Sequence, residues 1–303
     1  NTMKHKIITF GELMLRLSPD NNERFTQAHS YEAVYGGGEA NTAVSLANFN
    51  VDTRYVTKLP NHTIGQSAVN SLRQYGVDVS RIVRGGDQIG IYFLEKKTSQ
   101  RPTNVIYNRN GSAFALATKE DFDWNSIFEG ATWFHFSGIT PAISDNMAEI
   151  TIEACKEAKK RNITVSCDLN YRSKLWSSEK ANKVMSEVCK YVDICIANED
   201  DAVGIFGMDA SKSDKEKNAY IAEELTKMFP NFKMVASVWR TETSITTFKL
   251  QSMIYTDGKA YYSQEFFMNI LDYIGAGDAY CAGIIYSLIN GFGESAMPQY
   301  FPH

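Results

Sequence analysis

Long hydrophobic runs and paired cysteines are both missing from this sequence of 303 residues. No apolar stretch approaches the ~20 residues that a membrane-spanning helix needs, and the first apolar run, residues 7–10, is too short for the core of a signal peptide. The five cysteines include no CxxC pair and no spacing typical of metal ligands. These absences predict a reduced, cytoplasmic protein without a membrane partner.

A strong charge of one sign is missing as well. The chain carries 31 Lys and Arg residues against 35 Asp and Glu residues, which gives a formal net charge of −4. Because no run of Lys and Arg is long enough to follow a phosphate backbone, nucleic acid is not an expected partner. Hydrophobic residues make up 44% of the chain, enough to bury a substantial core, and the length suits one large α/β unit.

From about residue 131 onward, short apolar runs alternate with stretches of helical periodicity. Strands are predicted at 133–136, 163–167, 193–197 and 233–238, and helices at 146–160, 179–190 and 215–228. This alternation is typical of βαβ units, so it predicts a parallel sheet covered by helices on both faces.

The first third of the chain is richer in strands than the rest. Strands are predicted at 7–10, 12–17, 53–58, 89–95 and 104–107, and helices begin at the glycine triplet 36–38 and after Thr63. Near the other end, an antiparallel meander over 243–263 precedes a helix at 276–289. Since no repeat, linker or change of composition divides the chain, we predict one α/β body with a small β excursion from its N-terminal third.

The most informative motif is DYIGAGDA at residues 272–279. Gly275 and Gly277 flank Ala276 at the start of a predicted helix, so backbone N–H groups can converge there and hold a phosphoryl group at the positive end of the helix dipole. Asp278 would repel a phosphate, but it suits a base that takes a proton from an attacking hydroxyl. Taken alone, the motif is equally compatible with a packing turn whose Asp278 is an ordinary N-terminal helix acid.

A second motif, GGGEANTA, occupies residues 36–43. Glycines ahead of a helix let a ligand approach the backbone closely, and Asn41 on the first turn can hydrogen-bond sugar hydroxyls. The segment is not GxGxxG, and no acid follows at the distance that a ribose requires, so a dinucleotide site is not expected. The chain also lacks GxxxxGK[ST], which excludes the P-loop kinases. Taken alone, the triplet is better explained by a plain turn.

Together, the two motifs resemble those of the ribokinase-like (PfkB) carbohydrate kinases, in the same order and over nearly the whole chain. Asn198 and Asp201 stand where that family has an Asn-x-x-Glu motif. The resemblance implies a doubly wound α/β fold, with a mostly parallel sheet flanked by helices and a small β-sheet lid. It implies a single kinase domain over residues 1–303, with lid strands drawn from about 12–35 and 88–114.

The resemblance also implies the catalytic and nucleotide-binding parts. Asp278 would be the base, and Gly275, Ala276 and Gly277 would form the anion hole for the transferring phosphoryl group of ATP. Asn198 would join Gly275 and Gly277 on the nucleotide side.

Mg²⁺ is the second implied cofactor, with a monovalent cation as a further option. Asp201 would hold the metal through water, although it is one methylene shorter than the Glu of the family motif. A neighbouring acid could compensate for the shorter side chain.

Two further segments, YNRNGSA at 107–113 and DLNYRSKLW at 168–176, resemble those of 2-keto-3-deoxygluconate kinases. They contain Arg109 and Arg172, and a guanidinium group binds a carboxylate through two parallel hydrogen bonds. A neutral sugar would leave both arginines without an anionic partner. The expected substrate is therefore a sugar acid, phosphorylated by ATP on its terminal hydroxyl.

The remaining substrate contacts are expected from the lid and from the glycine triplet. Tyr92 and Tyr107 would offer hydroxyls and ring faces from the lid, while Gly37 and Asn41 would face the sugar hydroxyls. Taken singly, a surface arginine is usually solvated and a strand tyrosine is usually half in the core. His135, in an apolar run, is expected to be an interior residue with its hydrogen bonds satisfied.

Two alternatives stay open. One is a related kinase of a neutral sugar such as fructose, or of a nucleoside. The other is a catalytically silent sugar-acid sensor, suggested by the shorter Asp201 and by a sequence that stops soon after the catalytic helix, where family members generally continue with a helix on the adenine side. Exposed lid strands also predict a homodimer or higher homo-oligomer.

Overall fold

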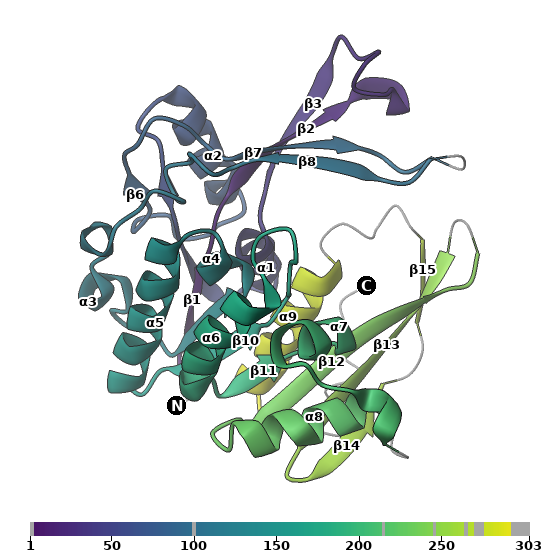
Figure 1. Cartoon of the computed structure of the whole chain (residues 1–303). Coiled ribbons are helices and arrows are strands. Elements are labelled where there is room, and N and C mark those ends of the chain that lie inside the picture. Colours follow the sequence, from purple (N-terminus) through teal and green to yellow (C-terminus); the bar gives the residue numbers. More distant parts are fainter. Residues whose placement is uncertain are drawn as a thin grey trace.

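The computed structural model describes residues 3–98, 101–213, 216–244, 247–263, 266–269 and 276–291. Its main body is built on one large sheet with helices on both sides, and a smaller sheet projects from it (Figure 1). Within these residues no helix combines the length and the apolar character needed to cross a membrane.

The large sheet has the strand order β14-β13-β12-β11-β10-β9-β1-β4, with β15 also paired to β13. Its parallel part comprises β1 (Lys6–Phe10), β4 (Asp52–Val56), β9 (Trp133–Ser137), β10 (Thr164–Asp168), β11 (Ile194–Ile196) and β12 (Met234–Glu242). Its antiparallel part comprises β13 (Thr247–Thr256), β14 (Lys259–Tyr262) and β15 (Phe266–Asn269). The sheet is therefore mostly parallel, as predicted.

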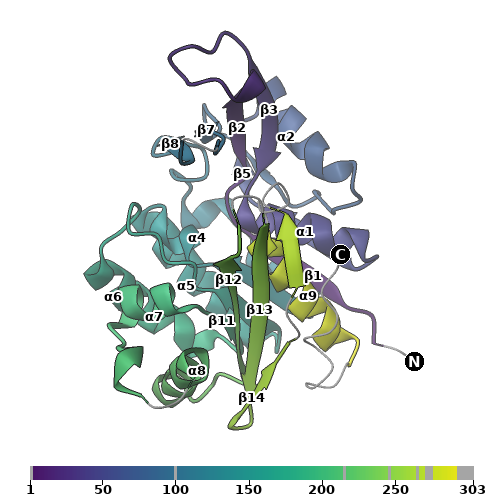
Figure 2. The ribbon, with the colours of Figure 1, turned by 90° about the vertical axis from the view of Figure 1, so that its right-hand side faces the viewer.

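Side chains that alternate along the buried strands build a core on each face of this sheet. Ile7 packs with α1 (Gly38–Asn48) and α9 (Ala276–Ile289) on one face. Ile8 packs on the other face, against the layer of α5 (Asp145–Lys160), α6 (Ser178–Val188), α7 (Glu199–Phe206) and α8 (Lys217–Met228). Figure 2 shows the two layers on opposite sides of the strands. Burial on both faces explains why β1, β9 and β11 are largely apolar.

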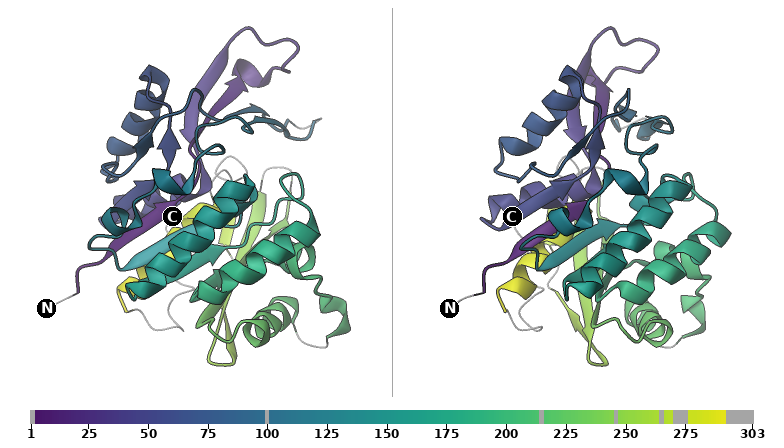
Figure 3. Two further views of the ribbon diagram at one scale, coloured as in Figure 1. Left: turned by 60° about the vertical axis from the view of Figure 1, so that its left-hand side comes forward. Right: turned by 90° about the vertical axis from the view of Figure 1, so that its left-hand side faces the viewer.

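The smaller sheet, which we call the lid, has the order β3-β2-β7-β8. Its strands are β2 (Met14–Pro19), β3 (Tyr31–Gly36), β7 (Ile91–Glu95) and β8 (Asn104–Asn108). β2 pairs in parallel with β7, and the outer pairs are antiparallel. Figure 3 shows from two sides how the lid projects from the body. Only three residues separate the end of β1 from the start of β2, so the lid is tied directly to the first body strand.

Shorter elements connect these layers. They are α2 (Thr63–Arg73), α3 (Trp124–Ile127), α4 (Ile139–Ala142), the two-residue strands β5 (Lys58–Leu59) and β6 (Val83–Arg84), and 3₁₀ turns at Asp20–Asn22, Lys119–Asp121, Cys189–Tyr191 and Ala210–Lys212. α2 and α1 share a separate apolar cluster with β4, in which Tyr55 is fully buried.

The predicted α/β fold with a lid is confirmed, and the differences lie in individual elements. The predicted meander over 243–263 contains β13 and β14, and β13 runs unbroken through the polar residues 251–252 because it pairs continuously with β12. β3 lies almost wholly within the predicted lid range of about 12–35 but was not predicted as a separate strand, because none of its residues is fully buried and it lacks a clear apolar pattern. α7 was not predicted, because it is short and opens with three acidic residues.

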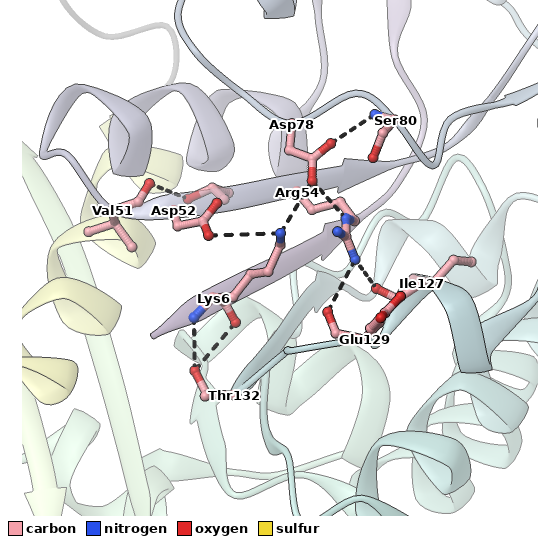
Figure 4. Close-up of polar contacts among 10 residues, drawn as sticks. Lys6, Val51, Asp52, Arg54, Asp78, Ser80, Ile127, Glu129 and Thr132 are labelled. Carbon is pink, nitrogen blue, oxygen red and sulfur yellow. Dashed lines mark hydrogen bonds and ion pairs between the residues drawn. The ribbon is translucent and has the colours of Figure 1, made fainter. Parts of the chain in front are cut away.

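A polar network closes the amino-terminal edge of the parallel strands, at the end opposite the lid (Figure 4). The buried Arg54 donates from Nε to Asp78 (2.9 Å) and from Nη1 to the carbonyl of Ile127 (2.8 Å). Lys6 lies 3.4 Å from the same Asp78 carboxylate. Burial alone would raise the pKa of Asp78, but hydrogen bonds from Ser80 and the Arg54 guanidinium outweigh it and lower that pKa below its usual value.

Replacing Asp78 by asparagine is expected to lower the free energy of unfolding by about 2–3 kcal/mol near pH 7, because it leaves the Arg54 guanidinium without its anionic partner. Since the folded-state pKa of Asp78 is depressed, this stabilisation is present above pH ~4 and is lost as the pH falls further. Urea unfolding at pH 7 and pH 3 measures both effects. The control is Asp52→Asn, whose exposed pair with Lys6 at 3.8 Å should contribute under ~1 kcal/mol.

Candidate active site

The carboxyl ends of the parallel strands meet the first turns of α1 and α9 beneath the lid (Figure 1). β1 lies between β4 and β9 in the sheet, so the chain leaves β1 toward one side and later returns on the other. In open α/β sheets, ligands bind outside the carboxyl ends of the strands at such a reversal of strand order. The fold therefore places a candidate site at the first turns of these two helices.

Asp278, on the first turn of α9, is joined to the first turn of α1. The amide Nδ2 of Asn41 donates to Asp278 Oδ2 at 3.0 Å, across 237 positions of sequence. Thr42 Oγ1 donates to the Asp278 carbonyl at 3.3 Å, and a Cβ at Gly38 would lie only 3.3 Å from Asp278 Oδ1. The structure thus unites the two motifs that sequence analysis selected at opposite ends of the chain.

The glycine-rich turn ahead of Asp278 is described in part. Ala276 opens α9, and Gly277 is exposed, with no atom of a described residue within 4 Å of the place where a Cβ would lie. No described side chain therefore fills the space beside Gly277. Gly275 lies outside the described residues.

The pKa of the Asp278 carboxyl group lies near neutral pH. Burial raises its pKa to about 7; the Asn41 hydrogen bond opposes this rise, the charge of Glu39 adds to it, and the charge of Arg172 opposes it. A carboxylate with a pKa near the working pH can both accept a proton and release it, as a general base requires.

Asp278 belongs to a group of acids that influence one another. Asp168 is the last residue of β10, and its pKa is raised strongly, first by burial and then by the charges of Asp201, Asp278 and Glu39. Glu39 on α1 is itself buried, and its Oε1 accepts from Thr140 Oγ1 and from the Ser137 amide, both at 2.9 Å.

Arg172 is the cation beside these acids. It lies exposed in the loop that follows β10, and its charge lowers the pKa of Asp168, Asp201 and Asp278. No ion pair or hydrogen bond ties its guanidinium group to a residue in the described part of the chain. Arg172 therefore lies near the acids with its donors open to an anionic ligand.

The lid contributes a row of side chains across three strands. Arg16, Tyr92 and Tyr107 are direct cross-strand neighbours, so they share one face of the lid sheet. The Tyr92 hydroxyl lies 3.5 Å from where a Cβ of Gly36 would be, and its pKa, raised mainly by burial, also responds to the charge of Asp278. Tyr92 in this row therefore lies beside the glycine triplet ahead of α1 and within electrostatic reach of Asp278.

Arg109, just past the end of β8, is held in a buried ion pair. Its Nε and Nη2 lie 2.9 and 2.8 Å from Glu12 Oε1, and its guanidinium carbon lies 5.5 Å from the centre of the Tyr107 ring. The Glu12 backbone also passes beside α1, because a Cβ at Gly37 would lie 2.1 Å from the Glu12 carbonyl. Gly37 is thus required for close backbone packing, whatever its contact with a sugar.

Comparison with known proteins identifies the family. The model of the pfkB family carbohydrate kinases matches residues 4–296. The chain belongs to this family. It is an ATP-dependent carbohydrate kinase with the ribokinase-like fold, as the resemblance of its motifs implied.

Individual relatives cover nearly the whole PfkB kinase. A 2-dehydro-3-deoxygalactonokinase of Haloferax volcanii is 33% identical over 292 residues, covering 95% of this chain and 86% of the relative. A 5-dehydro-2-deoxygluconokinase of Clostridium perfringens is 27% identical over 294 residues, covering 95% of this chain and 82% of the relative. The crystal structure of 2-dehydro-3-deoxygluconokinase from Thermotoga maritima superimposes with a TM-score of 0.93 at 44% identity, covering 98% of this chain and 90% of that one.

In this PfkB kinase, Asp201 and Asn198 have a structural role that the sequence did not reveal. Asp201 Oδ1 accepts from the Tyr171 amide at 2.7 Å, and its Oδ2 accepts from the Asn198 amide at 2.9 Å. Asn198 Oδ1 accepts from the Val238 amide at 3.3 Å. Asp201 therefore fixes the start of α7 together with the loop that carries Arg172. Its metal contact through water and the nucleotide contact of Asn198 stay predictions.

Sequence analysis did not select Glu12, Arg16, Glu39 or Asp168. Asp168 carried a usable signal, since an acid at the carboxyl end of a predicted parallel strand falls at the ligand-binding edge. Arg16 and Glu12 depend on strand register and on contacts about 100 positions away, which a local pattern does not contain.

His135 confirms its predicted interior role. Its Nδ1 lies 2.7 Å from Ser166 Oγ in the body core, and burial lowers its pKa to about 3. It therefore stays neutral near pH 7.

The pH dependence of the enzyme should report on Asp278. We expect kcat/KM to fall about tenfold per pH unit below pH ~7, as the carboxylate becomes protonated. Because the Asn41 hydrogen bond lowers the pKa of Asp278, Asn41→Ala should move this acid limb to higher pH. Initial rates from pH 5 to 9 measure the acid limb of kcat/KM in the wild type and in the variant. An acid limb that stays in place or moves to lower pH in Asn41→Ala contradicts the assignment of this limb to Asp278.

Proposed function

We propose that this PfkB kinase transfers the γ-phosphoryl group of ATP to the terminal hydroxyl of 2-keto-3-deoxygluconate, also called 2-dehydro-3-deoxygluconate. The observation that carries the proposal is the open guanidinium group of Arg172, which lies close enough to Asp278 to lower its pKa. A cation placed there, with no partner among the described residues, suits a substrate with a carboxylate at one end and a reactive hydroxyl at the other.

In this proposal the chain's own residues divide the work. Asp278 accepts the proton of the terminal hydroxyl, and Asn41 holds the carboxylate of Asp278 in place for it. The amides at the start of α9, including those of Ala276 and Gly277, face the transferring phosphoryl group. Arg172 and Arg109 bind the carboxylate of the sugar acid, and Tyr92 and Tyr107 cover the sugar from the lid.

We infer that Mg²⁺ arrives with the nucleotide. Among the residues that the structure describes, no group of three His, Cys, Asp or Glu side chains is arranged to hold a metal ion. Mg²⁺ commonly keeps several waters and binds through substrate phosphates and one or two carboxylates. Asp201 fits such a water-mediated role, since each of its oxygens accepts one backbone hydrogen bond and retains a further lone pair. The bound metal would neutralise charge on the phosphates.

The second candidate substrate is the C4 epimer, 2-keto-3-deoxygalactonate. It is favoured by the Haloferax volcanii relative, whose name refers to that acid. Both epimers carry the same carboxylate and terminal hydroxyl, so the roles of Asp278 and Arg172 are common to both. Homo-oligomer formation through the lid strands and a cytoplasmic location remain predictions.

The proposed function is tested by ADP release with ATP and Mg²⁺ over a panel of acceptors. The panel holds both keto-deoxy acid epimers, gluconate, fructose, ribose and adenosine. The expected result is turnover confined to the keto-deoxy acids, highest with 2-keto-3-deoxygluconate. Preference for a neutral sugar would agree with a carbohydrate kinase but contradict the binding of a substrate carboxylate by Arg109 and Arg172. Binding of a sugar acid without ADP release would favour the silent sensor.

A further inference from the structure

Glu12 and Arg109 form the most deeply buried ion pair among the residues that the structure describes. Glu12 follows β1 and Arg109 follows β8, and their side chains are only 2% and 7% exposed. The guanidinium group uses its side-on edge, Nε and Nη2, for the single oxygen Oε1 of Glu12. Its Nη1 donates to no residue in the described ranges. Since arginine carries five N–H donors in a planar fork, the end-on edge of Nη1 and Nη2 keeps a free pair of donors.

The Glu12 carboxylate is itself fixed from several sides. Its Oε2 accepts from Ser112 Oγ at 2.5 Å, and Ser112 Oγ in turn accepts from the Ala115 amide at 3.1 Å. A Cβ at Gly90 would lie 2.7 Å from Glu12 Oε2, so glycine makes room for the carboxylate at that position. These contacts hold both oxygens of the Glu12 carboxylate, and through Oε1 they hold the side-on edge of Arg109.

The pairing also changes what Arg109 can offer a ligand. Because Glu12 balances its charge, the pair as a whole attracts an anion weakly. Arg172 forms no direct ion pair with a described residue, although its charge acts on the acids near it. The two arginines of the predicted clamp therefore differ. Arg109 is held in place and its charge is balanced by Glu12, whereas Arg172 carries a charge that no direct ion pair within the described residues balances.

We propose that Glu12 is a positioning residue, which occupies the side-on edge of Arg109 so that the end-on edge is presented to the carboxylate of the sugar acid. In this arrangement Arg172 attracts the carboxylate and Arg109 orients it. The inference rests on the proposed function, because it needs an acidic substrate.

Two substitutions at Glu12 separate orientation from charge. Glu12→Asp keeps the charge but withdraws the carboxylate by one methylene, and Glu12→Gln keeps the reach and the acceptor oxygen but removes the charge. If Glu12 positions Arg109, Glu12→Asp should raise the KM for 2-keto-3-deoxygluconate about 10–100-fold, the scale of a lost hydrogen bond to a charged group, while Glu12→Gln raises it less. If Glu12 only neutralises Arg109, Glu12→Gln should lower that KM and Glu12→Asp should leave it unchanged.

A second substrate, 3-deoxyfructose, distinguishes loss of the Arg109 contact from general damage to the structure. 3-Deoxyfructose has the same skeleton and keto group as 2-keto-3-deoxygluconate, with a hydroxymethyl group in place of the carboxylate. A positioning role predicts that Glu12→Asp leaves the KM for 3-deoxyfructose and for ATP within about twofold, because neither engages the Arg109 fork. If Glu12→Asp does not fold, Ser112→Ala replaces it, because this milder change removes one hydrogen bond that holds Glu12. Ser112→Ala should also raise the KM for the sugar acid and leave the KM for 3-deoxyfructose and for ATP unchanged. Glu120→Asp, at an exposed position in the 3₁₀ turn Lys119–Asp121, is the matched control.

The outcomes separate the two claims. If the wild-type enzyme prefers the acid and Glu12→Asp or Ser112→Ala changes its KM by less than twofold, or changes both sugars equally, the inference falls and the proposed function stands. If the wild-type enzyme uses 3-deoxyfructose as well as the acid, the proposed function falls and takes the inference with it.

Discussion

Asp278→Asn should lower kcat by about 10²–10⁴-fold with little change in the KM of the sugar, because asparagine keeps the shape of the side chain but takes no proton from the attacking hydroxyl. The asparagine side chain can still hydrogen-bond Asn41, so the first turns of α1 and α9 should stay joined. The unfolding temperature should not fall. Burial raises the pKa of Asp278 to about 7, which means that the folded site disfavours the charged carboxylate.

Steady-state kinetics and thermal unfolding of the same preparation test this prediction. The matched control is Asp257→Asn in the exposed β13–β14 turn, where a positive φ of 50° suits asparagine as well as aspartate. It should leave kcat unchanged. Turnover by Asp278→Asn within a few-fold of wild type would remove Asp278 from its role as the base.

Arg172→Ala should raise the KM for the sugar acid by about 10–100-fold while the KM for ATP changes little, the scale expected for loss of a hydrogen bond to a charged group. Its removal also takes away a charge that lowers the pKa of Asp278, so the acid limb of kcat/KM should move to higher pH. Both effects follow from one guanidinium group near the acids at the strand ends.

The control for Arg172 lies two positions away. Lys174→Ala removes an exposed cation from the same loop, so it tests whether any positive charge there is enough. We expect it to change the KM by less than twofold. Equal rises in the KM of the sugar and of ATP in Arg172→Ala would contradict a clamp on the sugar carboxylate.

The fold was predictable because its strongest signals are local. The apolar runs at β1, β9, β10 and β11 and the amphipathic helices between them appear in the sequence at nearly their observed bounds. The lid was predicted less well, since β3 has no fully buried residue and its pairing with β2 is the main feature that defines it.

The candidate site was predictable only where a motif carried the chemistry. Asp278 and Asn41 each belong to a recognisable glycine-rich segment, and the fold brings the two into a 3.0 Å hydrogen bond. Arg109 was selected by its motif, but its partner Glu12 lies 97 positions away, in the connection between β1 and β2, so no local pattern could reveal that its charge is balanced. Asp201 likewise shows its backbone contacts only after β10 and β11 lie side by side.

The central claim is that the enzyme selects its substrate by the carboxylate, and one ratio tests it most directly. This is the ratio of kcat/KM for 2-keto-3-deoxygluconate to kcat/KM for 3-deoxyfructose, measured by ADP release with the wild-type enzyme at pH 7.5. The two sugars differ only at the group that Arg172 and Arg109 would bind. We expect a ratio of about 100 or more, arising mainly from KM, the scale of one or two charged hydrogen bonds. A ratio below about 3 would contradict the account.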